Sequence, residues 1–309
     1  MSSMEGQTEE QAPSCIAVSG SVLSRERIGA IGAITLVAGL GWWLLWEMAA
    51  EHAVSDGGYA ALGPGMAILD DVARIFGGNL PTEGFWGDIC RAFASGGGTQ
   101  ANVWSAGQFS TALAMWMLMA VAMMLPTAMP MISAHGDIQG AAHAKGLPRV
   151  AGWVFPAGYL AVWGALAVLG ASVQGGINLL MGEEPVLAHT MPIIGGGLLV
   201  MAGLYQWSAL KAACLSQCRS PMRFFMVHWR DGRWGAFRMG IRHGVFCAGC
   251  CWALMVLMFV GGAMNLVWMA ILTIIMLLEK VLPRGDVFGR VMGVVFVVWG
   301  GSLAISEFV

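Results

Sequence analysis

Charged residues are scarce in this chain of 309 residues. Asp, Glu, Lys and Arg make up 11% of it, whereas ordinary globular domains carry about 25%. A soluble protein with so little charge could not cover its own surface, and a disordered chain needs more charge and fewer apolar residues. The net charge of −2, without a basic domain, also excludes a nucleic-acid-binding protein. Seven cysteines, unevenly placed, are too few for a secreted disulfide framework.

Several catalytic motifs are absent as well. The sequence has no glycine-rich phosphate loop followed by Lys and Ser or Thr, and no His-Glu-x-x-His helix. It also lacks the Gly-x-Ser-x-Gly turn of serine hydrolases. An enzyme is therefore not the favoured class.

Apolar residues, at 57% of the chain, indicate an all-α, polytopic transmembrane helix bundle. Segments without Asp, Glu, Lys or Arg are long enough to cross a hydrocarbon core of about 30 Å at about 1.5 Å per residue. We expect about seven spans, or six. The junction between the fifth and the sixth consists only of Gly261, at the end of the fifth, and of Gly262 and Ala263, which predicts a tight helical hairpin or a re-entrant pair. The predicted spans are Ile28–Trp46, Phe109–Met131, Val150–Val173, Pro192–Leu210, Gly244–Gly261, Met264–Leu278 and Val291–Ile305.

Lysine and arginine positions predict the orientation. With the N-terminus in the cytoplasm, every lysine and arginine except Arg74 and Arg91 falls on the cytoplasmic side. Positive residues are enriched in cytoplasmic loops, so this orientation in the bacterial inner membrane is the one we expect.

The predicted domain organisation is simple. Residues 1–24 are polar and predict a disordered cytoplasmic tail, and they lack the apolar core of a signal peptide. Residues 25–309 form a single transmembrane helical domain, with a long external loop at 51–106 and a basic cytoplasmic loop at 211–243.

Cysteines gather at the cytoplasmic ends of the fourth and fifth spans. Cys214 and Cys218 are four residues apart and share a helix face, and Cys247, Cys250 and Cys251 share one side of the next span. If the two helices are neighbours, these thiols can form a site for a soft ion, with copper favoured and zinc as the alternative. Cysteine is also a common small buried residue, so packing alone is the competing interpretation.

Other residues can contribute to this site. His243 lies one turn before Cys247 and can add a nitrogen ligand. Met119 and Met123 belong to a row of thioethers along the second span, which suits Cu(I). For each, an ordinary packing or interfacial role is the alternative.

Glu279 ends an otherwise apolar span, which makes it a further candidate for function. Its neighbour Lys280 cannot share its helix face, so one of the two can face the bundle while the other reaches the lipid headgroups.

Between about residues 110 and 282 the chain contains a characteristic set of motifs: Trp116-x-x-Met119-x-x-Ala122-Met123-Met124-x-Pro126, Tyr159-x-x-x-Trp163, Tyr205-x5-Lys211-x-x-Cys214-x-x-x-Cys218, Cys250-Cys251-Trp252, Met264-Asn265-x-x-Trp268-Met269 and Glu279-Lys280. As a set, these motifs resemble a bacterial domain-of-unknown-function family of predicted metal-binding integral membrane proteins. The resemblance implies a multi-helix membrane fold and a metal site.

These patterns predict an integral membrane protein that binds or handles a soft metal ion in the cytoplasmic leaflet. Cys214, Cys218, Cys250 and Cys251 are the expected principal ligands, and Cys247, His243, Met119 and Met123 are the expected secondary ligands. The expected partners are the lipid bilayer and a cytoplasmic metal carrier or membrane complex. Two alternatives remain: a non-catalytic subunit or assembly factor of a larger complex, and a metal-dependent membrane oxidoreductase.

Overall fold

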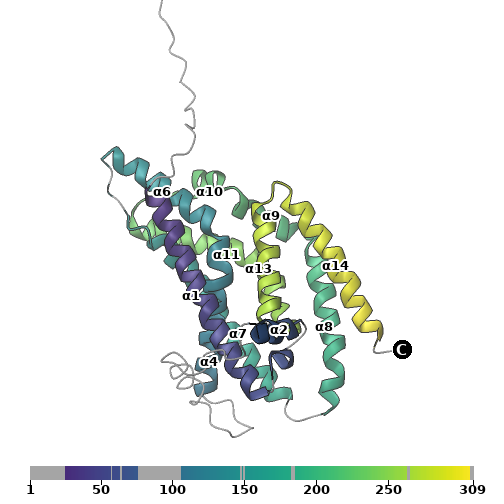
Figure 1. Cartoon of the computed structure of the whole chain (residues 1–309). Helices are drawn as coiled ribbons and strands as arrows, with labels where there is room; N and C mark the ends of the chain where they lie inside the picture. Colours follow the sequence, from purple (N-terminus) through teal and green to yellow (C-terminus); the bar gives the residue numbers. More distant parts are fainter. Residues whose placement is uncertain are drawn as a thin grey trace, which may run out of the picture.

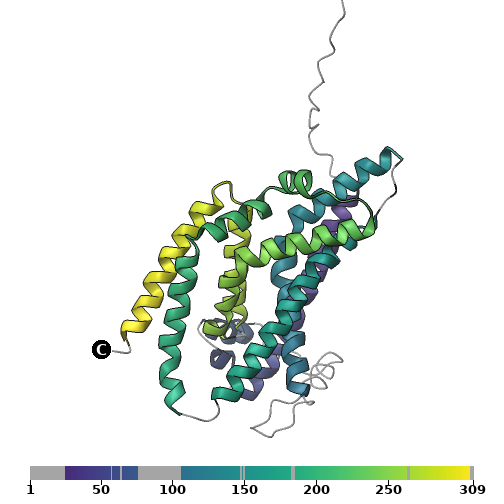
Figure 2. The same cartoon turned by 180° about the vertical axis from the view of Figure 1, so that it is seen from behind.

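Helices make up the regular structure of the part of the chain that the computed structural model describes, namely residues 25–56, 58–62, 65–75, 106–146, 148, 150–181, 185–262 and 265–306. The all-α prediction is confirmed for these residues (Figures 1 and 2). The elements are α1 (Arg25–Asp56), η1 (Tyr59–Leu62), α2 (Ala67–Ile75), α4 (Ala106–Met119), the π-helix η2 (Ala120–Met124), α5 (Leu125–Thr127), α6 (Met129–Ala144), α7 (Val154–Met181), α8 (Pro185–Tyr205), α9 (Ala209–Arg219), α10 (Pro221–His228), α11 (Gly232–Val256), α12 (Met258–Gly261), α13 (Leu266–Val281) and α14 (Gly285–Ser306).

Five helical segments of the described chain are long and apolar enough to cross a membrane, and the count is six if one bent pair is taken as a single span. The sixth predicted span corresponds to α13, whose 16 residues are fewer than the roughly 20 that a span needs. Seven spans therefore stay a prediction, as does the orientation of the N-terminus. The qualifying segments are Arg27–Ala50, Ala106–Thr127, Val154–Ile177, Gly232–Gly261 and Gly285–Ile305, and the bent pair is Ile193–Tyr205 with Ala209–Arg219.

The first helix is longer than the sequence predicted. The expected span ends at Trp46, whereas α1 continues to Asp56 and buries Met48, Ala49 and Ala53 near its end. Part of the predicted external loop is helical too, in η1 and α2. The predicted tail at 1–24 and residues 76–105 of the loop lie outside the described residues.

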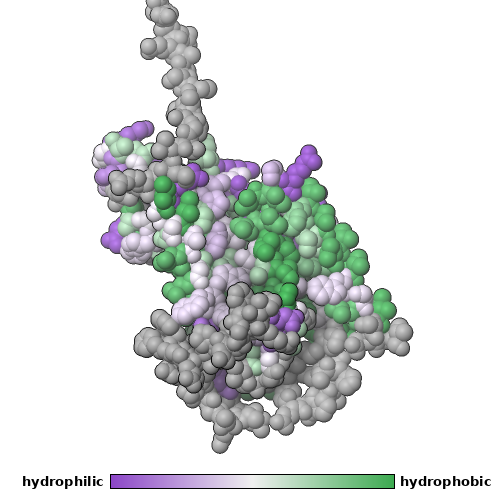
Figure 3. Space-filling model, in the orientation of Figure 1, coloured by the Kyte–Doolittle hydropathy of each residue, from purple (hydrophilic) through white to green (hydrophobic). Residues whose placement is uncertain are grey.

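Helices α8 and α14 pack side by side along one flank of the bundle (Figures 1 and 2). A Cβ atom at Gly203 of α8 would lie 2.7 Å from the carbonyl oxygen of Gly293 of α14, so the two backbones meet through glycines. Val291, Val294 and Val298 of α14 are exposed, and Figure 3 shows a hydrophobic surface over this flank. Such a surface suits contact with lipid tails.

Pro126 shapes the end of the second predicted span. Proline has no N–H group, so the carbonyl four residues earlier, at Ala122, lacks its usual helical partner. The indole Nε1 of Trp42 in α1 donates to this oxygen at 3.2 Å, and residues 120–124 adopt a π-helix. The second span is therefore irregular where it approaches the candidate site.

The fourth predicted span, Pro192–Leu210, runs through a break. α8 ends at Tyr205, and α9 begins after Ser208, whose hydroxyl accepts a hydrogen bond from the backbone N–H of Lys211. The two segments meet at 64°. This bend turns α9 across the end of the bundle, toward α11.

A tight turn joins α12 to α13, as the glycine spacing predicted. Gly262 has a φ of 94°, which glycine adopts without strain. Asn265 caps α13 by accepting from the backbone N–H of Trp268 and donates to the carbonyl of Gly261, each at 2.9 Å. The turn returns the chain to the end of the bundle where the cysteines lie.

Candidate metal centre

Three cysteines of α11 form a buried cluster. Cys247, Cys250 and Cys251 are at most 1% exposed, and their sulfur atoms all lie within 4.8 Å of one another. The sulfurs of Cys250 and Cys251 are 3.4 Å apart. Spacings of three and four residues put these side chains on one side of the helix, as the sequence indicated.

Helix α9 adds a fourth thiol to this cluster. It packs against α11, and the sulfur of Cys218 lies 3.9 Å from that of Cys250. Cys218 is buried, whereas Cys214 is half-buried. Cys214 also faces α11, next to Gly249, which precedes Cys250. A Cβ atom at Gly249 would lie 2.6 Å from the Cys214 sulfur. We refer to Cys218, Cys247, Cys250 and Cys251 together as the sulfur cluster.

Close backbone contact with α7 fixes α11. A Cβ atom at Gly240 would collide with the carbonyl oxygen of Phe155, and one at Gly158 would collide with that of Phe237. Gly244 continues the contact one turn later, where a Cβ atom would lie 2.9 Å from the Val162 side chain. Small residues of this kind let helices approach closely. The close packing of α11 on α7 therefore fixes the position of the helix that carries three of the cysteines.

Lys280 of α13 and Tyr159 of α7 also contact the sulfur cluster, through Cys247. The ammonium group of Lys280 donates to the sulfur of Cys247 at 3.1 Å and to the hydroxyl of Thr127 at 2.7 Å. The hydroxyl of Tyr159 lies 3.2 Å from the same sulfur and donates to the carbonyl of Met124 at 3.0 Å. Cys247 thus joins the cluster to α13, α7 and the π-helix.

Glu279 and Lys280 are both buried, at 1% and 9% exposure. The expectation that one of them reaches the headgroups was wrong, because the two side chains contact different helices. Glu279 accepts a hydrogen bond from Lys211 of α9 at 2.7 Å and forms a buried ion pair with it. Gly289 of α14 leaves room for this carboxylate, since a Cβ atom there would lie 3.0 Å from its Oε1.

His243 lies on α11 one turn before Cys247 and is 1% exposed. Its ring stacks on Tyr159 and Phe155, with ring centroids 5.4 and 6.0 Å away. Among the described residues neither ring nitrogen has a hydrogen-bond partner. The imidazole nitrogens of His243 are therefore not engaged in hydrogen bonds with other described residues. They do not belong to the group of ligand atoms of the described residues that all lie within 4.8 Å of one another, which contains only the sulfurs of the three α11 cysteines.

Met119 and Met123 are fully buried at the junction of α4 and the π-helix. Among the described residues, the hydrogen bonds of the sulfur cluster include none to either thioether. This segment is linked to the cluster through the Met124 carbonyl and Tyr159. The structure thus brings four of the predicted cysteines together and buries both methionines in the same core.

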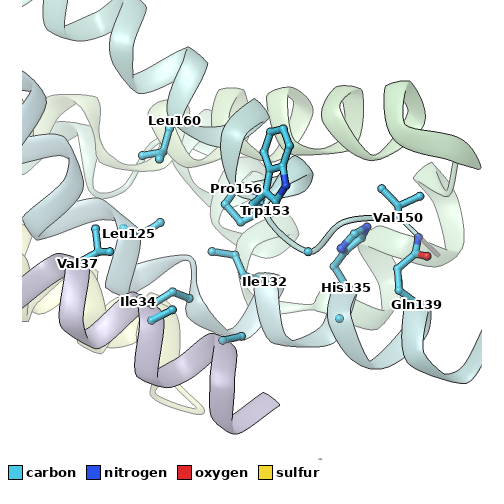
Figure 4. Close-up of a pocket in the computed structure, with 14 residues that line it drawn as sticks. Ile34, Val37, Leu125, Ile132, His135, Gln139, Val150, Trp153, Pro156 and Leu160 are labelled. Carbon is cyan, nitrogen blue, oxygen red and sulfur yellow. The ribbon is translucent and has the colours of Figure 1, made fainter. Parts of the chain in front are cut away.

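A cavity of about 470 Å³ lies between α1, α6 and α7 (Figure 4). His135 and Gln139 lie at one end and Val37 and Leu125 at the other. The ring of His135 stacks on Phe155 at 4.9 Å. Burial lowers the pKa of His135 to about 4, so this imidazole is neutral at physiological pH.

The donor set suits a soft ion. Two sulfurs that bind one ion at about 2.3 Å each are at most about 4.6 Å apart. The separations of 3.4 Å between Cys250 and Cys251 and of 3.9 Å between Cys218 and Cys250 meet this limit. Cys218 does not belong to the set of sulfurs that all lie within 4.8 Å of one another, which comprises the three cysteines of α11. Thiolates favour Cu(I) and Zn(II), whereas oxygen-preferring ions such as Mg²⁺ find no carboxylate among the cluster residues.

Several residues at the centre were not singled out from their chemistry in the sequence. Tyr159 and Lys211 were named in the motifs that carry the family resemblance, but neither they nor Thr127 were candidate site residues. The available signal was the presence of polar residues at span ends that the sequence predicted to be cytoplasmic, a feature shared by Thr127, Lys211 and Lys280. Which of these side chains face one another depends on helix neighbours, and a single sequence does not give them.

A protein-family model described as "PpoB2: Copper chaperone" matches residues 113–303. The matched region includes the sulfur cluster, Cys214, Lys211, Glu279 and Lys280. No curated protein and no solved structure was found to match the chain.

Proposed function

This chain belongs to the PpoB2 copper chaperone family, and on that premise we propose that it is an inner-membrane protein that holds Cu(I) in the sulfur cluster. Zn(II) is the second candidate, because thiolates bind both ions. The observation that carries the proposal is the meeting of four buried thiols from two helices, with Cys218 and Cys250 only 3.9 Å apart.

Burial supports copper binding in particular. Cu(I) prefers soft ligands, and the side chains around the cluster keep its sulfurs away from solvent. In the proposed site Cys218, Cys250 and Cys251 are principal ligands, and Cys247 completes the set beside Lys280. Cys214 is a principal ligand during uptake and release, because it is half-buried beside the cluster. His243, Met119 and Met123 are secondary ligands.

Exchange with a cytoplasmic copper carrier is the proposed task of the site. The segment after α9 exposes a row of positive side chains, and the predicted orientation puts this segment in the cytoplasm. An acidic face on a carrier protein would be attracted to it, which raises the rate of association. The exposed arginines are Arg223, Arg230, Arg233, Arg238 and Arg242.

Copper analysis of the purified full-length protein tests the proposal. Titration with Cu(I) against a chromophoric chelator should give about one ion per chain, bound well enough to compete with the chelator. Cys218→Ser and Cys250→Ser should each weaken binding by more than about tenfold, because each removes a thiolate ligand. Cys90→Ser, outside the described residues, is the matched control.

A wild-type protein that fails to retain Cu(I) under reducing conditions would refute the proposal. Equal retention by the wild type and by a Cys218→Ser/Cys250→Ser double variant would refute the assigned ligands. If the protein retains Zn(II) in preference to Cu(I), and the same variants lose it, the assigned ligands would be supported and Zn(II) would be the bound metal.

A further inference from the structure

Polar contacts hold both ends of α9. At its start, Lys211 forms the buried ion pair with Glu279 of α13, at 2.7 Å. At its end, Arg219 donates to the carbonyl oxygens of Leu282 and Pro283, each at 2.6 Å, and lies 3.5 Å from Asp286. The helix that carries Cys218 is thus fastened to α13 and to the turn after it.

This attachment differs from that of α11. Glycine contacts between backbones fix α11 on α7, whereas α9 begins after a 64° break in the chain and depends on side chains. A break between helical segments absorbs changes of angle more readily than a continuous helix. The position of Cys218 therefore depends on the contacts that fasten α9.

Lys211 and Cys218 are seven residues apart, which corresponds to two helical turns and the same face of α9. Any displacement of Lys211 away from Glu279 carries Cys218 with it. Cys218 and Cys250 are separated by 3.9 Å, and two ligands of one ion tolerate at most about 4.6 Å. A shift of about 1 Å is therefore enough to remove Cys218 from a shared ion.

We infer that Glu279 is a positioning residue for the sulfur cluster: through Lys211 it holds α9 against α11, so that Cys218 can bind the same ion as Cys250. The inference rests on the proposed copper site. Glu279 itself contacts no ion. It acts on the accessibility of the cluster as well, because α9 covers the thiols on the side where Cys214 is half-buried.

The test needs variants that fold. Removing one member of a buried ion pair leaves an unpaired charge and is strongly destabilising, whereas replacing both members by apolar residues of similar size is often neutral. The central variant is therefore Lys211→Met with Glu279→Leu, and its partner is the reversed pair, Lys211→Glu with Glu279→Lys. Asp137→Asn, in an exposed ion pair at 4.0 Å from Arg27, is the control.

Two readouts separate positioning from simple stability. The first is the rate at which a maleimide labels each cysteine of the metal-free, full-length protein, mapped by mass spectrometry. Cys218 should be labelled at least tenfold faster in the apolar double variant, while the control equals the wild type. The second is X-ray absorption of the Cu(I)-loaded protein, which should show one sulfur ligand fewer in the double variant. The reversed pair should restore both readouts.

A folded double variant with wild-type labelling of Cys218 and a wild-type sulfur count would overturn the inference, because the pair would then serve stability alone. Failure of the proposed function looks different: the wild type itself would bind no Cu(I), whatever the labelling rates of the variants. Gly289→Ala gives an independent check, since its Cβ atom would press on the Glu279 carboxylate from α14. It should speed the labelling of Cys218 in the same direction.

Discussion

The ammonium group of Lys280 lies 3.1 Å from the sulfur of Cys247, and its other hydrogen-bond partner is the neutral hydroxyl of Thr127. Among the described residues no carboxylate forms an ion pair with Lys280, because the neighbouring Glu279 is paired with Lys211. A buried charge without a counter-charge is costly. In the proposed site, the thiolates of the sulfur cluster are the anionic partner of this lysine.

Lys280→Met should weaken Cu(I) binding by about a hundredfold. Even two of the proposed thiolate ligands give the Cu(I) complex a net charge of −1, and the ammonium lies within about 5 Å of such an ion. At an effective dielectric constant of about 20 this attraction amounts to about 3 kcal/mol. Competition with a Cu(I) chelator measures the change.

Lys280→Arg keeps the positive charge and should remain within about tenfold of the wild type. Thr127→Val removes the other hydrogen bond of Lys280 without removing charge, and should behave like the arginine variant. Undiminished affinity in a folded Lys280→Met protein would show that the ammonium does not stabilise the copper–thiolate complex.

Met123→Leu should weaken Cu(I) binding only a few-fold. The substitution nearly conserves volume, so the packing around the π-helix should survive at a cost below about 1.5 kcal/mol. Met119→Leu should act similarly, because both thioethers are at most secondary ligands in the proposed site. A loss as large as that of Cys250→Ser, measured by the same titration, would instead make the thioether a principal ligand.

The protein should lose stability as the pH falls from about 6.5 to about 4, in part because of His135. Its pKa is about 4 when folded and about 6.5 in an unfolded chain. The unfolded state therefore gains a proton in this range that the native state does not accept. The stabilisation is complete above pH 6.5, and about 3 kcal/mol of it is lost by pH 4.

Thermal unfolding midpoints of the detergent-solubilised protein across this pH range measure the effect. His135→Leu should flatten the pH dependence by about one proton relative to the wild type. Parallel curves for the wild type and His135→Leu would contradict the assignment.

Gly240→Ala should destabilise the protein by about 1–3 kcal/mol, because the new methyl group meets the Phe155 carbonyl and forces α7 and α11 apart. Gly39→Ala in α1 has no neighbouring atom within 4 Å. It should raise the unfolding midpoint slightly, since alanine favours a helix over glycine by up to about 1 kcal/mol. Equal unfolding midpoints for the two variants would mean that α7 and α11 separate at Gly240 without a loss of stability.

Composition and apolar segments were sufficient to predict the helical class and most of the long helices. They did not predict the break after Tyr205, because the spans were defined by the absence of charged residues and Gln206, Trp207 and Ser208 carry no charge. α1 passes the end of its apolar segment because Met48, Ala49 and Ala53 are buried against other helices. Both differences arise from tertiary contacts.

At the candidate site, spacing placed Cys247, Cys250 and Cys251 on one side of a helix, and the structure has them there. Whether α9 and α11 are neighbours was a supposition that only coordinates could test. Lys280 was the main surprise. Its burial depends on Thr127, more than 150 residues earlier in the chain, and no local pattern signals such a partner.

The π-helix after Met119 also sets a rotational register. One extra residue in a turn rotates everything beyond it by about 100° relative to a regular α-helix. The Met124 carbonyl meets the Tyr159 hydroxyl only in this register. A single-residue deletion between 120 and 124 would restore ordinary winding and turn that carbonyl away, so the alignment of Tyr159 beside Cys247 depends on an irregularity in a helix that contributes no thiol of its own.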